Sequence, residues 1–123
     1  MINKIMHRLF YPYNKTVYIG KVFSLEELQA IADILSRHPH VTVVMDEVYE
    51  KLVYDGNTHI RLASLPNMWD RTLTVSSCGK TFSCTGWKVG WVYGAAYLVK
   101  PVVLANQWIQ YCVSSPTQAK HSS

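Results

Sequence analysis

Apolar side chains recur at three- and four-residue spacing after Ser24, which predicts a helix with one buried face. The residues that would share this face are Leu25, Leu28, Ile31, Ala32 and Leu35. Ser24 and Glu27 have the spacing of a capping box, in which each side chain accepts a hydrogen bond from the backbone N–H of the other residue. Pro39 cannot continue a helix. We therefore predict a helix that begins after Ser24 and ends before Pro39.

Three further segments have the composition of β-strands. Residues 41–45 are almost all apolar and β-branched and end at Asp46 and Glu47, which is typical of a strand covered on both faces in a parallel sheet. Residues 73–76 predict a second strand, and residues 89–93 a third that a tight antiparallel connection would join to it. A helix followed by a buried strand is half of a β-α-β unit. The predicted fold is therefore α/β, with a mostly parallel sheet and flanking helices.

The remaining segments carry turn and helix signals. Residues 48–68 contain the turn pairs Asp-Gly at 55–56 and Pro-Asn at 66–67, so we expect loops and short helical turns there. Helical spacing resumes over residues 101–112, whose first residue is a proline that the first turn of a helix tolerates. Residues 114–123 are expected to be a disordered end of the chain.

Charge and composition exclude several classes of protein. The 123-residue chain has a net charge of +4, but residues 1–25 hold four basic and no acidic side chains, whereas residues 26–123 hold eight of each. A nucleic-acid binder would spread basic residues over a folded face, so no nucleic-acid partner is expected. No apolar run approaches the roughly 20 residues of a membrane span. Residues 1–19 lack the apolar core of a secretory signal and are expected to be an irregular N-terminus.

The three cysteines, Cys78, Cys84 and Cys112, are odd in number and form no C-x-x-C pair. This usage indicates reduced thiols in a cytosol-like compartment. We therefore expect a cytoplasmic protein. A mitochondrial location is the alternative, because residues 1–15 are acid-free like a transit peptide, although they hold one arginine and no serine. No metal site is expected, since the histidines on either side of Pro39 have no cysteine nearby.

Lys80 is the first candidate for chemistry. It lies in residues 76–83, a run of small and hydroxylated residues directly after a predicted strand, and Lys88 follows it. These two lysines are the only charged side chains between Arg71 and Lys100, so no local carboxylate neutralises them. Weakly solvated surroundings and a neighbouring like charge both favour the neutral amine. A neutral lysine is a ready nucleophile.

Asp46 is the second candidate. Asp46 and Lys80 each stand at or just past the carboxyl end of a predicted strand, where open α/β sheets bind ligands. Pyridoxal 5′-phosphate requires a lysine that forms a Schiff base and an acid that keeps the pyridine nitrogen protonated. Lys80 and Asp46 match these two requirements. Tyr49 would donate a hydrogen bond to the phenolic oxygen of the ring, and Ser77 and Lys88 would bind the phosphate.

Four segments resemble the class I, fold-type-I aminotransferases, and within that group the kynurenine aminotransferase and cysteine-S-conjugate β-lyase branch. They are residues 46–49 (Asp-Glu-Val-Tyr), residues 54–56, residues 63–66 and, most specifically, residues 77–91, which read Ser-Cys-Gly-Lys-Thr-Phe-Ser-Cys-Thr-Gly-Trp-Lys-Val-Gly-Trp. The resemblance covers residues 20–118, about four fifths of the chain.

The resemblance implies a role for each candidate residue. Lys80 would be the internal-aldimine lysine and proton shuttle, Asp46 the partner of the pyridinium nitrogen and Tyr49 the donor to O3′. Ser77 and Lys88 would be phosphate ligands. The implied activity is amino-group transfer between an L-amino acid, kynurenine or a similar one, and a 2-oxo acid. The implied assembly is the homodimer typical of the family.

The sequence also departs from the family pattern. An Asn-Pro pair, whose asparagine contacts the cofactor ring, is replaced by Val17-Tyr18. The glycine-containing phosphate loop, the stacking aromatic residue and the arginine that binds the substrate carboxylate have no counterpart here. We therefore expect residues 1–19 not to match the family, residues 20–118 to be a central fragment of its large, cofactor-binding domain, and residues 119–123 to be a disordered tail. Exposed strand edges and apolar faces would leave such a fragment with weak cofactor binding and no turnover.

Two alternatives stay open. One is a catalytically inactive truncated or regulatory fragment of such an enzyme, or the product of an incomplete gene model. The other is a phosphate-loop NTPase, because residues 43–47 resemble a strand that ends in a magnesium-binding acid and residues 79–81 resemble the end of G-x-x-x-x-G-K-[ST]. The phosphate-loop motif lacks its first glycine, which would fall at Thr74. The motif also follows the magnesium-binding acid in the sequence, although in such NTPases the phosphate loop precedes the acid.

Overall fold

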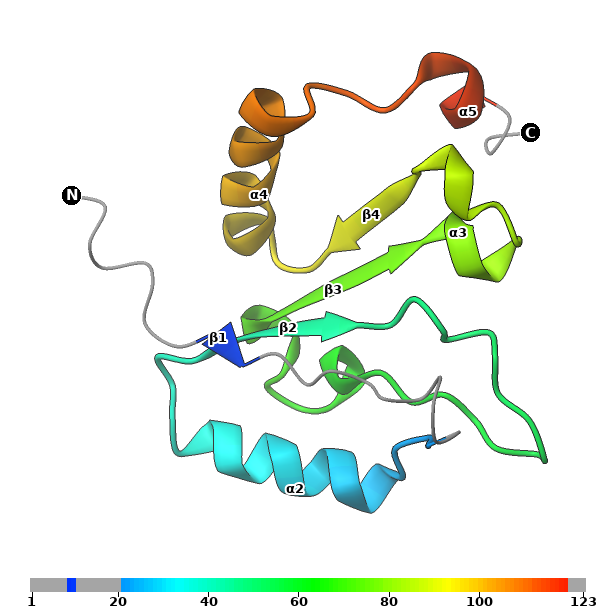
Figure 1. Ribbon diagram of the computed structural model, residues 1–123. Helices are drawn as coiled ribbons and strands as arrows, with labels where there is room; N and C mark the ends of the chain where they lie inside the picture. The colour runs from blue at the N-terminus through cyan, green and yellow to red at the C-terminus, as the bar shows by residue number, and fades with distance from the viewer. Residues whose placement is uncertain (1–8, 11–20, 120–123) are drawn as a thin grey trace.

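The computed structural model describes residues 9–10 and 21–119, and in these residues one mixed sheet carries the fold (Figure 1). The strands lie in the order β1 (Leu9–Phe10), β2 (Thr42–Asp46), β3 (Thr72–Ser77) and β4 (Gly90–Tyr93). β1 pairs with β2 and β2 with β3 in parallel, whereas β3 pairs with β4 antiparallel. The predicted α/β fold with a mostly parallel sheet is confirmed, and so is the antiparallel third predicted strand.

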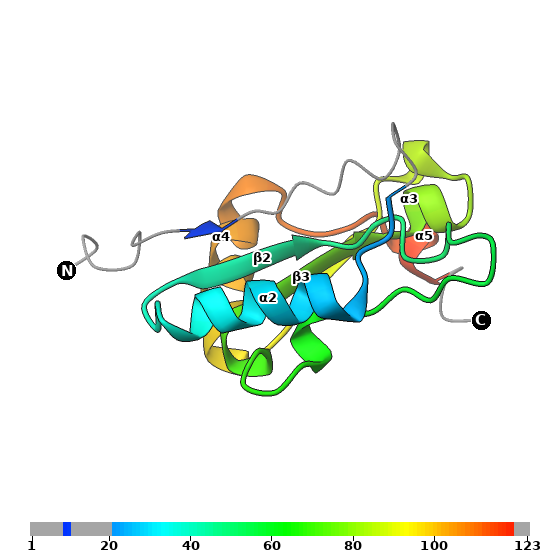
Figure 2. The ribbon, with the colours of Figure 1, turned by 90° about the horizontal axis from the view of Figure 1, so that it is seen from below.

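Helix α2 (Leu25–Ser36) covers one face of the sheet (Figure 2). Its capping box is present as predicted: the Ser24 hydroxyl accepts from the Glu27 N–H at 3.2 Å, and the Glu27 carboxylate accepts from the Ser24 N–H at 3.0 Å. Leu25 was expected on the buried face, but it is 49 % exposed because it lies in the first turn, beyond the cover of the sheet. The buried core joins α2 to β2 and the following loop; it comprises Leu28, Ala32, Leu35, Val43, Met45, Leu62 and Met68.

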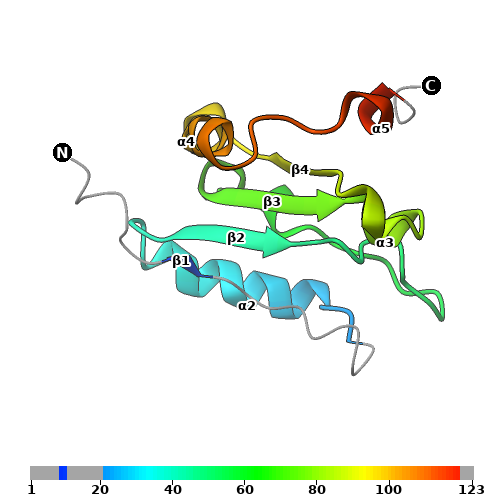
Figure 3. The same cartoon turned by 45° about the horizontal axis from the view of Figure 1, so that its top comes forward.

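The two faces of β2 differ in burial. Val43 and Met45 point into the core under α2 and are buried. Thr42, Val44 and Asp46 alternate with them and are only half-buried. The prediction of a strand covered on both faces is therefore wrong for the described residues. The physical reason is that α4 (Ala96–Ile109) lies on that side of the sheet (Figure 3), and an open cavity remains between α4 and the strands β2 and β3.

The long connection from β2 to β3 has the predicted loops and short helical turns. It contains two 3₁₀ turns, η1 (Leu62–Ser64) and η2 (Trp69–Arg71). Both predicted turn pairs adopt left-handed backbone, with φ of 57° at Asp55 and 62° at Asn67. Such values suit the short polar side chains of these residues.

Arg71 ties the end of this connection to α2 and β2. Its guanidinium donates to the carbonyl oxygens of Leu35 and Val41, each at 2.7 Å, and to that of His38. The last carbonyls of a helix lack partners within the helix, so a cation that donates hydrogen bonds to them stabilises the helix end. Arg71 therefore joins the end of α2, the entry to β2 and the entry to β3.

The connection from β3 to β4 and the last helices depart from the predictions. β3 and β4 are joined through α3 (Cys78–Thr81) and η3 (Thr85–Trp87), so the expected tight turn is wrong. α4 begins at Ala96, which makes Pro101 an interior residue, because the weakly patterned residues before Pro101 also become helical. Ser115–Ala119 form the short helix α5, so disorder is wrong for these residues. In the described part of the chain, no helix has both the length and the apolarity to cross a membrane.

Candidate functional site

Lys80 lies just past the carboxyl end of β3, as the sequence predicts. β3 ends at Ser77, and the chain turns directly into α3, whose third residue is Lys80. The Cys78 N–H donates to the carbonyl of Val89 at 3.2 Å, which fixes the start of α3 to the entry of β4. This backbone hydrogen bond therefore holds the turn with Lys80 against the entry to β4.

An open cavity of about 710 Å³ borders Lys80. Val44, Leu73 and Val75 of the sheet line it, and α4 lines it from the other side with Val102, Val103 and Asn106. Three of the predicted site residues, Ser77, Lys80 and Lys88, lie on this same cavity. The cavity thus combines aliphatic walls with several hydroxyl groups and two amines, as many small-molecule sites do.

The register of the sheet places Asp46 beside this cavity. It pairs with Val75 across the β2–β3 ladder, and Val44 pairs with Leu73. Side chains alternate along a strand, so Asp46 shares the cavity face of β2 with Val44. The Asp46 carboxylate accepts from the Val48 N–H at 3.2 Å. Within the described residues, neither Asp46 nor the half-buried Tyr49 lines the cavity itself.

The expected weakly solvated surroundings of the lysines are wrong in the described residues. Lys80 and Lys88 are both exposed. The physical reason is that the cavity beside them is open, so both side chains remain accessible to water. The described residues therefore gather the two lysines at one site but leave them in contact with water.

The backbone around the lysines is strained and tightly packed. Ser83 and Lys88 both adopt left-handed backbone, with φ of 54° and 57°. Such conformations cost of order 1–3 kcal/mol and cluster at functional sites. The Gly79 carbonyl accepts from the Cys84 N–H at 2.9 Å and from the Thr85 hydroxyl at 3.2 Å. Because the residues around Lys80 are folded back on one another, this turn presents the amine from a fixed base.

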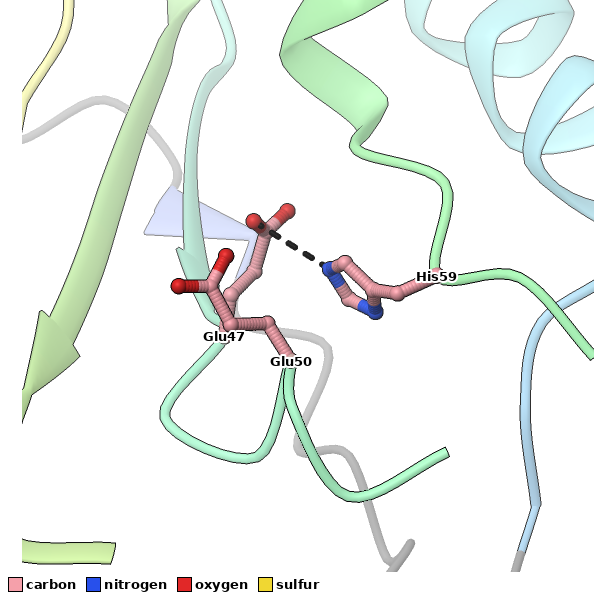
Figure 4. Close-up of side chains that lie close together, drawn as sticks. All are labelled: Glu47, Glu50 and His59. Atoms are coloured by element: carbon pink, nitrogen blue, oxygen red, sulfur yellow. Dashed lines mark ion pairs between the residues drawn. The ribbon is translucent and has the colours of Figure 1, made fainter. Parts of the chain in front are cut away.

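A second polar cluster lies on the other face of the sheet (Figure 4). The Glu47 side chain is only 1 % exposed, and one of its oxygens lies 3.3 Å from His59 Nε2 and 3.3 Å from Arg61 Nε. Arg61 also forms an ion pair with Glu50, which raises the pKa of Arg61. Glu47, Glu50 and His59 offer ligand atoms within 4.8 Å of one another.

The Arg61 guanidinium already supplies positive charge to both carboxylates of this cluster, as a metal ion would. We therefore interpret the cluster as a structural tether between the end of β2 and the loop that precedes η1. The cluster could not be predicted from the sequence, because its side chains come from separate segments of an irregular connection. The only available signal was a second acid, Glu47, directly after Asp46.

The chain belongs to the class I and II aminotransferases, whose family model matches residues 17–121. It is 50 % identical over 108 residues to a kynurenine–oxoglutarate transaminase of Dictyostelium discoideum, covering 87 % of this chain and 24 % of that protein. It is 54 % identical over 108 residues to kynurenine–oxoglutarate transaminase 3 of Rattus norvegicus, covering 88 % and 23 %. The chain therefore spans about a quarter of the length of these curated relatives.

Solved structures agree with this assignment. N-succinyldiaminopimelate aminotransferase from Mycobacterium tuberculosis superposes with a TM-score of 0.82 at 42 % identity, over 94 % of this chain and 30 % of that one. The aromatic aminotransferase from Pyrococcus horikoshii OT3 gives 0.80 at 34 % identity, over 90 % and 30 %. The predicted resemblance to class I aminotransferases and their kynurenine branch is confirmed, and the phosphate-loop alternative finds no support. Members of this family depend on pyridoxal 5′-phosphate.

Proposed function

We propose that this chain carries the cofactor-binding lysine of an aminotransferase that transfers an amino group between an L-amino acid, kynurenine or a similar one, and a 2-oxo acid. One observation carries the proposal: Ser77, Lys80 and Lys88 line a single cavity at the carboxyl end of β3. The neighbouring parallel strand ends in Asp46 on the same face. The kynurenine–oxoglutarate transaminases among the relatives support the substrate class.

The residues that line the cavity, together with Asp46 at the end of β2 and Tyr49 after it, fit pyridoxal 5′-phosphate. The phosphate is an anion, and the Ser77 hydroxyl and Lys88 ammonium are a donor and a positive charge suited to it. Asp46 offers a carboxylate to a protonated ring nitrogen, and Tyr49 a phenol that donates to the ring oxygen. When bound, the cofactor supplies the electron withdrawal that acidifies the α-carbon of an amino acid.

Lys80 would carry out most of the chemistry of this chain. Its Nζ would hold the cofactor covalently. As a free amine, Nζ would accept a proton from the substrate α-carbon as general base and donate it again as general acid. The hydrogen bonds that the Cys84 N–H and the Thr85 hydroxyl donate to the Gly79 carbonyl would keep the base of this side chain in place.

The whole protein would complete the site. We propose the homodimer of the family as its assembly, the cytoplasm as its location with the mitochondrion as the alternative, and weak cofactor binding without turnover for the 123-residue chain alone. Apolar exposure supports the last point, because Trp108 and Ile109 of α4 are 90 % and 77 % exposed. The same observation favours the second candidate function, an inactive or regulatory fragment of such an enzyme.

Cofactor capture by the purified chain tests the proposal. The chain is incubated with pyridoxal 5′-phosphate, reduced with borohydride and mapped by mass spectrometry. We expect the yellow absorption band of lysine-bound cofactor and a pyridoxyl group on Lys80 in preference to Lys100, an exposed lysine of α4. Lys80→Ala should remove the band, and Lys100→Ala should keep it. Equal labelling of Lys80 and Lys100 would contradict the proposal.

Transamination assays separate the two candidate functions. A chain that binds the cofactor at Lys80 but converts no amino acid, kynurenine included, would be the inactive or regulatory fragment. Formation of the 2-oxo acid from kynurenine by the chain would identify it as an enzyme by itself.

A further inference from the structure

Cys78 and Cys84 flank Lys80 in the sequence, and their sulfurs lie close together in the fold. Cys78 Sγ and Cys84 Sγ are 3.6 Å apart. Cys78 is fully buried at the start of α3, and Cys84 is half-buried just before η3. Both are free thiols. The pair therefore closes the base of the turn that presents Lys80.

The backbone of this turn holds the two thiols in place. The Phe82 N–H donates to the Cys78 carbonyl and the Cys84 N–H to the Gly79 carbonyl, each at 2.9 Å. A disulfide has a sulfur–sulfur distance of about 2.05 Å, so the sulfurs must approach by only about 1.5 Å. Rotation of the two short side chains would have to supply this movement.

We propose that Cys78 and Cys84 are a reversible redox site, which a peroxide converts into an intramolecular disulfide that closes a loop around Lys80. Such pairs in cytosolic proteins are usually redox-sensing rather than structural. Cys112 is exposed in the segment after α4 and takes no part. The proposal concerns the thiols alone and does not depend on the proposed function.

The reaction balances with a peroxide as the oxidant. The Cys84 thiol releases its proton, and the thiolate attacks one peroxide oxygen. The O–O bond breaks, a sulfenic acid forms, and the leaving hydroxide takes up that proton to become water. The Cys78 sulfur then attacks the Cys84 sulfur, so that the S–S bond forms, the S–O bond breaks and a second water leaves. The two thiols lose two electrons, which reduce the peroxide. A dithiol such as dithiothreitol reverses the oxidation by thiol–disulfide exchange.

The surroundings of Cys84 set the pace of this reaction. Desolvation, together with the hydrogen bond to Cys78, raises the pKa of the Cys84 thiol above its ordinary value. The thiolate is the reactive form, so oxidation is slow at neutral pH and accelerates as the pH rises through the alkaline range.

Mass spectrometry of the full chain tests the proposal. Cys112→Ser protein is treated with hydrogen peroxide, so that links between molecules do not interfere. We expect a mass loss of about 2 Da, from the two thiol hydrogens, that dithiothreitol restores. Trypsin cleaves after Lys80, so residues 72–80 and 81–88 should be recovered as one linked pair until reduction.

A matched variant separates geometry from mere proximity in sequence. In the same background, Cys84→Ser with Ser83→Cys moves the thiol by one residue to an exposed position. The linked pair should then fall roughly tenfold, because the sulfurs no longer face each other. Separate oxidation of Cys78 and Cys84 without a link, or equal linking in the displaced variant, would overturn the proposal.

Discussion

Asp46 stands directly opposite Val75 in the parallel ladder of β2 and β3. Parallel pairing brings the carboxyl ends of both strands to one edge of the sheet, and β3 passes into α3 only two residues beyond Val75. An acid from one strand and an amine from the next turn therefore lie at the same edge. Open α/β sheets bind their ligands at such an edge.

The charge of Asp46 should govern cofactor affinity. Asp46→Asn preserves the shape of the side chain and its bond from the Val48 N–H but removes the partner of a protonated ring nitrogen. We expect roughly tenfold weaker binding of pyridoxal 5′-phosphate, the loss of one charge-assisted hydrogen bond. Absorbance titration measures this affinity. Asp33→Asn, on the exposed side of α2, should leave it unchanged, and equal affinity in both variants would exclude the assigned role.

Gly79 should be indispensable for the turn that carries Lys80. A Cβ at this position would lie 3.1 Å from the backbone Cα of Thr85 and 3.4 Å from the side-chain oxygens of Ser77 and Thr85. Gly79→Ala should therefore lower the free energy of unfolding by about 1–3 kcal/mol, as overpacking does.

Gly86 offers the matched control for Gly79, since a Cβ there meets nothing within 4 Å. Gly86→Ala should change the free energy of unfolding by less than about 1 kcal/mol. Urea titration compares the two variants. Equal destabilisation would show that the packing of Thr85 onto Gly79 does not constrain the turn.

The buried Glu47 should be needed for stability rather than for chemistry. Glu47→Gln removes the buried charge that His59 and Arg61 face. Arg61 is partly exposed and keeps its ion pair with Glu50, so we expect a loss of about 1–3 kcal/mol. Urea titration should show this loss, whereas Glu26→Gln in the exposed first turn of α2 should show little. An unchanged unfolding midpoint in Glu47→Gln would contradict the tether.

Tyr93 should make the fold sensitive to alkali. Burial, followed by the charge of Glu47, raises the pKa of Tyr93 above its ordinary value of 10.0. The folded state therefore keeps the phenol protonated where the unfolded state has begun to ionise. The contribution of Tyr93 to the free energy of unfolding is fully present below about pH 10. It is lost as the pH rises through the pKa of Tyr93 in the folded state.

Tyr93→Phe should flatten the fall of stability above about pH 10, because phenylalanine does not titrate. Thermal unfolding across this range measures the effect. Tyr54→Phe, at a position that is 71 % exposed, is the control and should keep the full slope. Identical slopes in both variants would show that Tyr93 is not the group responsible.

Local signals in the sequence predicted local structure well. The capping box of Ser24 and Glu27 depends on residues three apart, and it is present with both of its hydrogen bonds. The turn at Asp55 follows likewise from the conformations that its own side chain allows. Pro101 misled the prediction, because its rule concerns the first turn of a helix and here five helical residues precede it.

Relationships between distant segments were beyond the sequence. The open face of β2 depends on where α4 lies, and the cluster around Glu47 on how the loop with His59 returns to the strand. The proximity of Cys78 and Cys84 depends on the shape of one turn. The two residues do not have the C-x-x-C spacing from which such proximity could be predicted. The positions of Lys80 just after a strand and of Asp46 at the end of one were predictable, whereas the cavity that joins Lys80 to Ser77 and Lys88 required the structure.

The hydrogen bonds of the Arg71 guanidinium affect how parts of the molecule open locally. One cation bridges carbonyl oxygens of Leu35, His38 and Val41, so fraying of the helix end would also release the first residues of two strands. These three segments should therefore open as one cooperative unit, and their amide protons should exchange with solvent at a common rate.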